Sequence, residues 1–177
     1  MIITDEKILR MKCNDALPEE VGPIVEQLER ELEHSERIGR AGIGLAAPQI
    51  NIHKNIAIVR INDIYKVNLV NCKIINQYDK IIFKNEGCLS FANRLEDTMR
   101  YQEVHVANNL VYPNSFIATG LFGVCIQHEL DHLSGILLPD IALPKPKQKV
   151  RPNDICPCGK INKLTGRSLK YKKCCGK

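Results

Sequence analysis

IQHELDHLSG, residues 126–135, has two histidines four positions apart, with a glutamate directly after the first. Positions i and i+4 of a helix lie on the same face, so His128 and His132 can hold one metal ion between them. Glu129 would then lie beside the ion as a proton acceptor. A catalytic metal site usually has three protein ligands and one open position, so the third ligand must come from elsewhere in the chain.

The segment after His132 offers no good third ligand. Zinc peptidases with the longer motif HExxHxxGxxH would need a histidine where this chain has Leu138. Other peptidases of this class use a glutamate well downstream, but Glu129 is the last glutamate in the chain. Asp140 and Asp154 are the remaining carboxylates there, so we expect the ligand to lie upstream.

Upstream, the stretch NEGCLSFANR (residues 85–94) carries Cys88 between a glycine and a short polar turn. A thiolate is a good ligand for zinc and for ferrous iron, and a Cys/His/His set leaves a fourth position for water. Free cysteines are also common as small buried hydrophobes. Spacing alone therefore leaves Cys88, Cys72 and Cys125 as alternatives.

The bulk composition is that of an ordinary globular protein, with 44% hydrophobic and 25% charged residues in a chain of 177. The first residues lack the apolar core of a secretory signal, and the longest nearly apolar stretch, residues 116–126, is too short to cross a bilayer. We therefore expect a cytoplasmic monomer with no membrane partner. Its eight cysteines are then expected to be metal ligands, catalytic groups or buried thiols rather than disulfides.

Charge changes sharply along the chain. Residues 1–144 contain 14 Lys and Arg against 19 Asp and Glu, whereas residues 145–177 contain 11 Lys and Arg and a single acid, Asp154. The change coincides with LPKPKQKVRPND, whose prolines and lysines indicate an extended linker. The predicted parts are a main domain over residues 1–143, a linker over 144–152 and a small module over 153–177.

Hydrophobic periodicity in the main domain favours the α+β class. Helical spacing of apolar residues predicts two helices, over residues 18–40 and 121–134. Short β-rich runs between them predict strands at residues 56–61, 65–70, 80–83, 103–107 and 116–119. Periodicity alone does not give the order of the strands.

Three stretches together resemble the signature motifs of one family, the peptide deformylases: GIGLAAPQ (residues 42–49), EGCLS (86–90) and QHELDH (127–132). The motifs occur in the family's order, and the resemblance covers residues 5–141. It implies an α+β fold in which antiparallel sheets surround a central metal-bearing helix. It also implies removal of the formyl group from N-formylmethionine at the start of nascent chains.

The same resemblance implies a metal centre and its chemistry. One divalent ion, commonly ferrous iron in the cell and often replaced by zinc or nickel, would be held by Cys88, His128 and His132. The ion lowers the pKa of bound water, and Glu129 would accept the water proton and pass it to the leaving amine. The side-chain amide of Gln49 and the backbone N–H of Leu89 would receive the negative charge on the formyl oxygen.

Residues for substrate binding follow from the same match. The substrate main chain would pair with Ile43 and Gly44 like an added strand. Arg94 would contact that main chain, and Glu86 would form a supporting ion pair with Arg100. The apolar slot for the methionine side chain would be lined by Ile43, Leu121, Val124, Cys125 and His128.

The basic tail carries a second cysteine cluster. CPCG (residues 156–159) and KKCCGK (172–177) predict a closed structural zinc site, which stabilises a fold too small for a core. Its four ligands would be Cys156, Cys158, Cys174 and Cys175. The tail resembles the SEC-C zinc motif over residues 151–177, and its charge suits ribosomal RNA or an acidic protein as partner. A tail that only improves solubility is the alternative.

Three functions remain open on these grounds. The first is a deformylase acting on N-formylmethionyl nascent peptides, with the tail as a docking module. The second is a related metallo-amidase or peptidase with another substrate. The third is a catalytically idle zinc-binding adaptor, which is weakened because Glu129, Gln49 and the three metal ligands are all present.

Overall fold

The computed structural model describes residues 1–144, 151–156, 158–162 and 165–176. The chain divides into two compact units, Met1–Leu143 and Pro144–Lys177. Residues 145–150, most of the predicted linker, lie outside the described residues. Each unit is therefore considered by itself.

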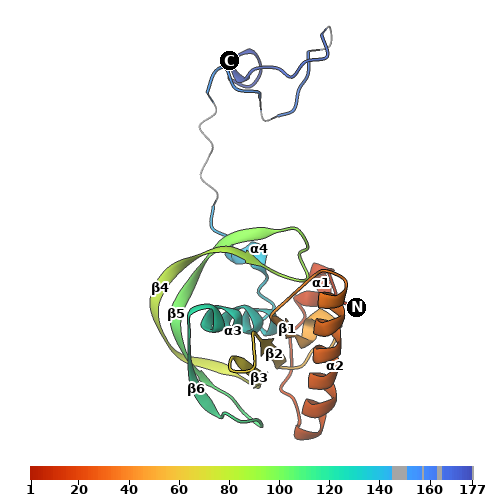
Figure 1. Cartoon of the computed structure of the whole chain (residues 1–177), viewed down its shortest axis with the longest axis vertical. Coiled ribbons are helices and arrows are strands. Elements are labelled where there is room, and N and C mark those ends of the chain that lie inside the picture. The colour runs from red at the N-terminus through yellow and green to blue at the C-terminus, as the bar shows by residue number, and fades with distance from the viewer. Residues whose placement is uncertain (145–150, 157, 163–164, 177) are drawn as a thin grey trace. The chain divides into compact units, whose positions relative to one another are not determined.

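The helix α3 (Gly120–Leu133) runs through the middle of the first unit, with strands around it (Figure 1). It packs against β1, β2, β5 and β6. Its apolar residues Val124, Cys125, Ile126 and Leu133 are buried, so packing on the strands fixes which face of the helix points to solvent. The predicted helix over residues 121–134 agrees with α3 to within one residue at each end.

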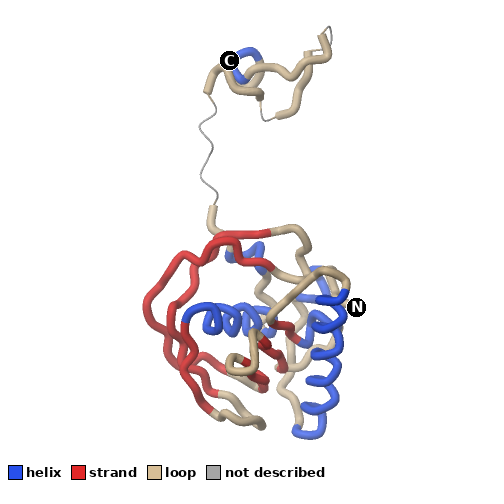
Figure 2. The backbone as a smooth tube through the Cα atoms, in the orientation of Figure 1, coloured by secondary structure: helices blue, strands red, loops and turns tan. Residues whose placement is uncertain are grey.

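Two antiparallel three-stranded sheets flank this helix (Figure 2). One contains β1 (Gly44–Ala46), β2 (Ile56–Arg60) and β3 (Lys66–Val70), in that order. The other contains β4 (Lys73–Gly87), β5 (Leu95–Ala107) and β6 (Ser115–Thr119). The predicted class, antiparallel sheets around a central helix, is confirmed.

The strand predictions were too short in the second sheet and missed one strand in the first. β4 and β5 extend well beyond the predicted runs 80–83 and 103–107. Most of β4 is exposed on both faces, so it lacks the alternation of apolar and polar residues that predicts a strand. β1 was missed because a stretch with two glycines and a proline favours a turn.

α2 (Pro18–Arg37) ends three residues before the predicted limit. Its buried residues Ile24, Val25, Leu28 and Leu32 join the core cluster formed with the first sheet. Three short elements complete the unit, namely α1 (Glu6–Leu9), the 3-10 helix η1 (Ala47–Ile50) and α4 (Leu138–Ile141). Arg10 connects both ends of the unit, because its guanidinium donates to Asp140 at 2.7 and 2.9 Å.

The described residues of the second unit contain little regular structure. They contain the 3-10 helix η2 (Tyr171–Lys173) and isolated bridges that pair Ile155 with Lys170 and Ile161 with Ser168.

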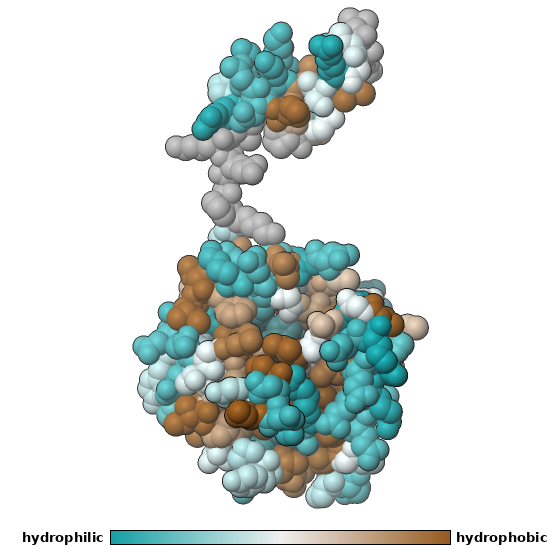
Figure 3. Space-filling model, in the orientation of Figure 1, coloured by the Kyte–Doolittle hydropathy of each residue, from teal (hydrophilic) through white to brown (hydrophobic). Residues whose placement is uncertain are grey.

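Throughout the described part of the chain, none of the helices combines the length and the apolar character needed to cross a lipid bilayer. Figure 3 shows hydrophilic surface over α2 and apolar surface in the middle of the same face.

Candidate functional site

α3 presents its two histidines on one side, as the four-residue spacing requires. The imidazole centroids of His128 and His132 are 5.0 Å apart. Burial, followed by the neighbouring His128, lowers the pKa of His132 to about 3. The His132 ring is therefore neutral and has a nitrogen lone pair available for a metal ion.

Cys88 completes a group of three ligand atoms with these histidines. It follows β4, and its Sγ lies 3.2 Å from Nε2 of His132. The three ligand atoms all lie within 4.8 Å of one another. One ion with bonds of about 2.0–2.3 Å can therefore contact all three, and a sulfur and two imidazoles suit zinc or ferrous iron. The alternatives Cys72 and Cys125 are not part of this group.

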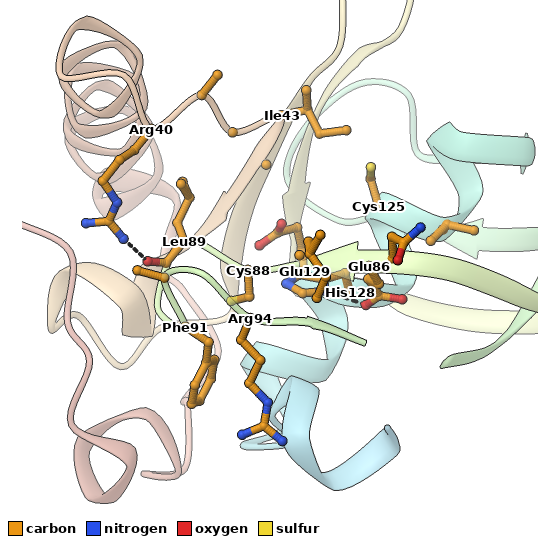
Figure 4. Close-up of a pocket in the computed structure, with 18 of the residues that line it drawn as sticks. Arg40, Ile43, Glu86, Cys88, Leu89, Phe91, Arg94, Cys125, His128 and Glu129 are labelled. Carbon is orange, nitrogen blue, oxygen red and sulfur yellow. Dashed lines mark hydrogen bonds and ion pairs between the residues drawn. The ribbon is translucent and has the colours of Figure 1, made fainter. Parts of the chain in front are cut away.

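Glu86, at the end of β4, holds His128 in position. Its Oε1 lies 2.6 Å from Nδ1 of His128, so that nitrogen donates to the carboxylate and Nε2 is left for a metal (Figure 4). Burial would raise the pKa of Glu86, but hydrogen bonds from Arg100 and His128 outweigh it and lower the pKa to about 2. Glu86 is therefore charged at neutral pH.

Arg100 joins this carboxylate to the metal-bearing helix. It donates from Nε and Nη2 to the two oxygens of Glu86 at 2.8 and 2.5 Å, and from Nη1 to Asp131 of α3 at 2.6 Å. Thr98 adds a hydrogen bond to Glu86 at 2.5 Å. The structure thus brings together the expected pair Glu86 and Arg100. Sequence reasoning missed both partners: Thr98 lies outside the three motifs, and Asp131 lies within QHELDH but nothing in the motif indicates its contact with Arg100.

Glu129 lies beside the ligand group with its side chain enclosed. Burial raises the pKa of Glu129 to about 7, and its Oε2 has no hydrogen-bond partner among the described residues. A Cβ atom on Gly44 would lie 2.4 Å from Oε1 of Glu129, so only glycine lets β1 approach the carboxylate this closely. A carboxyl group with a pKa near 7 can both accept and release a proton.

The side-chain amide of Gln49 is held with its nitrogen toward Cys88 and Ser90. Its Oε1 accepts from the backbone N–H of Ala46 at 2.9 Å. Its Nε2 lies 3.1 Å from Oγ of Ser90 and 3.7 Å from Sγ of Cys88. Ser90 belongs to the stretch EGCLS, so its position beside a motif cysteine was a signal that could have identified it.

A pocket of about 750 Å³ opens over these groups. Of the residues expected to bind substrate or to line the methionine slot, the pocket includes Ile43, Gly44, Leu121, Val124, Cys125, Arg94 and His128. Gln49, Leu89 and Glu129 also line it. Leu121 is 48% exposed, so it lies at the solvent side of the wall rather than in the core.

Arg94 occupies another part of the pocket wall. Its Nε donates to Oε1 of Glu96 at 2.8 Å, and the side chain of Glu96 is 7% exposed. The buried carboxylate therefore anchors the base of a half-exposed guanidinium. Figure 4 shows Arg94 directed away from the ligand group.

The second unit contains the other cysteine group. The four sulfurs of Cys156, Cys158, Cys174 and Cys175 lie within 4.8 Å of one another. A hydrogen bond from the backbone N–H of Cys158 lowers the pKa of the Cys156 thiol to about 6, whereas the Cys158 thiol raises the pKa of Cys174 to about 12. Four sulfurs this close together form the closed Cys₄ set that structural zinc uses, so the group fits a zinc ion.

Comparison with known sequences shows which family the chain resembles. The family model described as polypeptide deformylase matches residues 1–148. The chain is 39% identical over 114 residues to the peptide deformylase of Pseudoalteromonas translucida, covering 62% of this chain and 68% of that protein. It is 37% identical over 116 residues to peptide deformylase 2 of Xanthomonas axonopodis pv. citri, covering 62% and 66%. The chain thus spans about two thirds of the length of these relatives.

Solved structures give the same result for the fold. A peptide deformylase from Plasmodium falciparum matches with a TM-score of 0.72 and 28% identity, over 86% of this chain and 91% of that one. A peptide deformylase from Synechococcus elongatus, solved in complex with actinonin, matches with a TM-score of 0.71 and 29% identity, over 82% and 79%. The antiparallel sheets and central helix therefore have close counterparts of known structure.

Proposed function

Because the chain belongs to the peptide deformylase family of metal-dependent hydrolases, we propose that it removes the formyl group from N-terminal formylmethionine of nascent polypeptides. The observation that carries this proposal is the group of Cys88, His128 and His132, of which Cys88 and His128 line one pocket together with Glu129. The cytoplasm, where nascent chains emerge, is the compartment we assign.

The three ligand residues would hold one divalent ion, which we propose to be ferrous iron in the cell, with zinc or nickel as substitutes. When bound, such an ion supplies Lewis-acid chemistry: it lowers the pKa of water and polarises a carbonyl oxygen. The hydrogen bond from Nδ1 of His128 to Glu86 supports this role, because it leaves the other ring nitrogen free as a ligand.

Glu129 is the proposed general base and acid. It takes a proton from the water that attacks the formyl carbon and later delivers it to the amine nitrogen as the carbon–nitrogen bond breaks. The products are formate and a peptide with a free N-terminal amine. The pKa of Glu129, raised to about 7 by burial, suits both proton transfers near neutral pH.

Two donors are proposed to stabilise the negative charge that develops on the formyl oxygen. They are Nε2 of Gln49 and the backbone N–H of Leu89. Both residues line the pocket. The N–H of Ala46 donates to Oε1 of Gln49, so Nε2 of the same amide faces Cys88. Fixed donors need no reorganisation at the moment of reaction, which is the condition for effective catalysis of this kind.

The peptide is proposed to bind along β1. This strand pairs with β2 on one side only, so its other edge remains open among the described strands. An extended peptide can add to such an edge through main-chain hydrogen bonds, here at Ile43 and Gly44. The methionine side chain would enter the part of the pocket lined by Val124 and Cys125, with Leu121 at its rim.

The tail is proposed to hold one zinc ion and to dock the enzyme on ribosomal RNA. Its described residues include Arg151, Lys160, Arg167, Lys170, Lys172 and Lys173 against the single acid Asp154. A folded module with this charge attracts phosphate groups strongly. An acidic protein partner is the alternative, and it is favoured if the intact and truncated proteins co-sediment equally with ribosomes at low salt.

One assay tests the enzymatic proposal directly. The intact protein is incubated with formyl-Met-Ala-Ser, acetyl-Met-Ala-Ser and an unblocked Met-Ala-Ser peptide, and released formate, acetate and amino acids are measured. Release of formate alone is the expected result. Release of acetate or cleavage of a peptide bond would favour a related amidase or peptidase, and no turnover with metal bound would favour an adaptor.

A further inference from the structure

Arg40 lies in the pocket wall but has no part in the chemistry described so far. Its Nη2 donates a hydrogen bond to the backbone carbonyl of Leu89 (Figure 4). Arg40 follows α2, whereas Leu89 follows β4, so the bond joins two segments that are distant in sequence and both line the pocket.

The backbone of Arg40 is itself fixed by the end of α2. The hydroxyl of Ser35 donates to the carbonyl of Arg40 at 2.7 Å, and the N–H of Arg40 donates to the carbonyl of Ser35 at 2.8 Å. Ser35 is 1% exposed, so both hydrogen bonds are shielded from water. A side chain that starts from a fixed backbone can hold its partner in one place.

A second contact joins the same two segments. A Cβ atom on Gly42 would lie 2.5 Å from Cδ1 of Leu89, so the Leu89 side chain fills the space over this glycine. Leu89 is therefore held at its carbonyl by Arg40 and at its side chain by Gly42. Both contacts come from the segment that leads into Ile43 and Gly44, where the substrate main chain is proposed to pair.

We infer that Arg40 is a positioning residue, which fixes the Leu89 backbone relative to the peptide-binding edge at Ile43 and Gly44. The inference rests on the proposed function, in which the N–H of Leu89 stabilises the charge on the formyl oxygen. Such a donor must lie about 2.7–3.1 Å from that oxygen. A displacement of about 1 Å can lower the rate about a hundredfold, so loosening Leu89 should act mainly on kcat.

Steady-state kinetics on the metal-loaded full chain test this role. Arg40→Met should lower kcat for formyl-Met-Ala-Ser about tenfold or more, with KM changed less than about threefold and full metal content. Arg40→Lys should recover most of kcat, because an ammonium can still donate to the carbonyl. Arg37→Met removes an exposed arginine of α2 and serves as the matched control, with wild-type kinetics expected. Wild-type kcat in Arg40→Met, or a change in KM alone, would overturn the inference.

Hydrogen exchange gives a readout that does not depend on activity. Peptic fragments that cover residues 88–92 should exchange faster in Arg40→Met than in Arg37→Met, with the rest of the chain unchanged. Equal exchange in the two variants would reject the positioning role even if kcat falls. A wild-type enzyme that releases no formate would count against the proposed function instead, while unequal exchange would still support the contact between Arg40 and Leu89.

Discussion

The carboxylate of Glu129 lies directly against the backbone of Gly44, at a distance that leaves no room for a Cβ at this position of β1. The strand that is proposed to bind the peptide and the residue that is proposed to move the proton are thus in contact. Replacing either partner has a predictable effect, which the first two predictions address.

Gly44→Ala should lower kcat about tenfold or more, because the added methyl group would displace the carboxylate of Glu129 from its present position. Formate release and a thermal melt are the measurements. Gly22→Ala is the matched control, since a Cβ there meets no atom of another element within 4 Å. That control, on the exposed face of α2 and outside the residues that line the pocket, should keep its activity. Normal activity in Gly44→Ala would show that the close approach has no catalytic consequence.

Glu129→Ala should keep the fold and the metal but lose turnover by about a hundredfold or more, since Glu129 moves protons and is not among the three ligand residues. Formate release, circular dichroism and elemental analysis of the same preparation check the three parts of this expectation. A loss smaller than about tenfold would remove Glu129 from the proton transfers.

Cys88→Ala should lose both the metal and the activity, because a site reduced to two imidazoles binds a divalent ion far more weakly. Cys72→Ala is the control, since Cys72 is also a partly buried free thiol but is not in the ligand group. Elemental analysis after desalting measures the metal. Full occupancy in Cys88→Ala would exclude this residue from the metal centre.

Glu86 should make stability depend on pH in acid. Its pKa in the folded protein, about 2, is below its ordinary value of about 4.3, so its contribution is present above that ordinary value. The contribution, at most about 3 kcal/mol, is lost as the pH falls from about 4.3 toward 2. Urea unfolding of the metal-free protein should therefore show Glu86→Gln to be less stable than wild type at pH 7, with a smaller gap at pH 3.

Glu26→Gln provides the comparison for that series. Glu26 forms an ion pair with Arg30 at 3.6 Å, but the carboxylate side chain is 71% exposed. Surface pairs of this kind contribute about 0–1 kcal/mol, so this variant should follow the wild type at every pH. A constant gap between Glu86→Gln and wild type from pH 7 to pH 3 would contradict the role of the Glu86 charge.

Truncation after Leu143 should leave hydrolysis of formyl-Met-Ala-Ser close to normal, because all of the proposed catalytic residues belong to the first unit. The same truncation should weaken ribosome co-sedimentation, and binding of the intact protein should fall steeply as salt rises. Replacing Cys174 and Cys175 by serine should mimic the truncation, since the proposed zinc ion would lose two of its four ligands and with them its stabilisation of the module. Equal sedimentation of both forms at low salt would reject ribosome docking in favour of a protein partner or a solubility role.

The sequence was most informative where a motif carries chemistry in a short stretch. The membership in the family, inferred from three motifs, is confirmed, and α3 was located almost to the residue. The length of β4 was not predictable, because its exposed faces remove the pattern on which strand prediction depends. Thr98, Asp131 and Arg40 were missed for another reason: each acts through a partner that is distant in sequence, and only the folded chain shows which one.

Sulfur ligands give the two metal centres different sensitivities to oxidation. Cys158 and Cys175 are exposed, whereas Cys88 is only partly accessible. Oxidants attack accessible thiolates first, and the sulfurs of Cys156 and Cys158 lie only 3.3 Å apart. On the proposed functions of the two units, an oxidative burst would therefore disable the tail before the catalytic centre, and deformylation of free peptides would outlast docking at the ribosome.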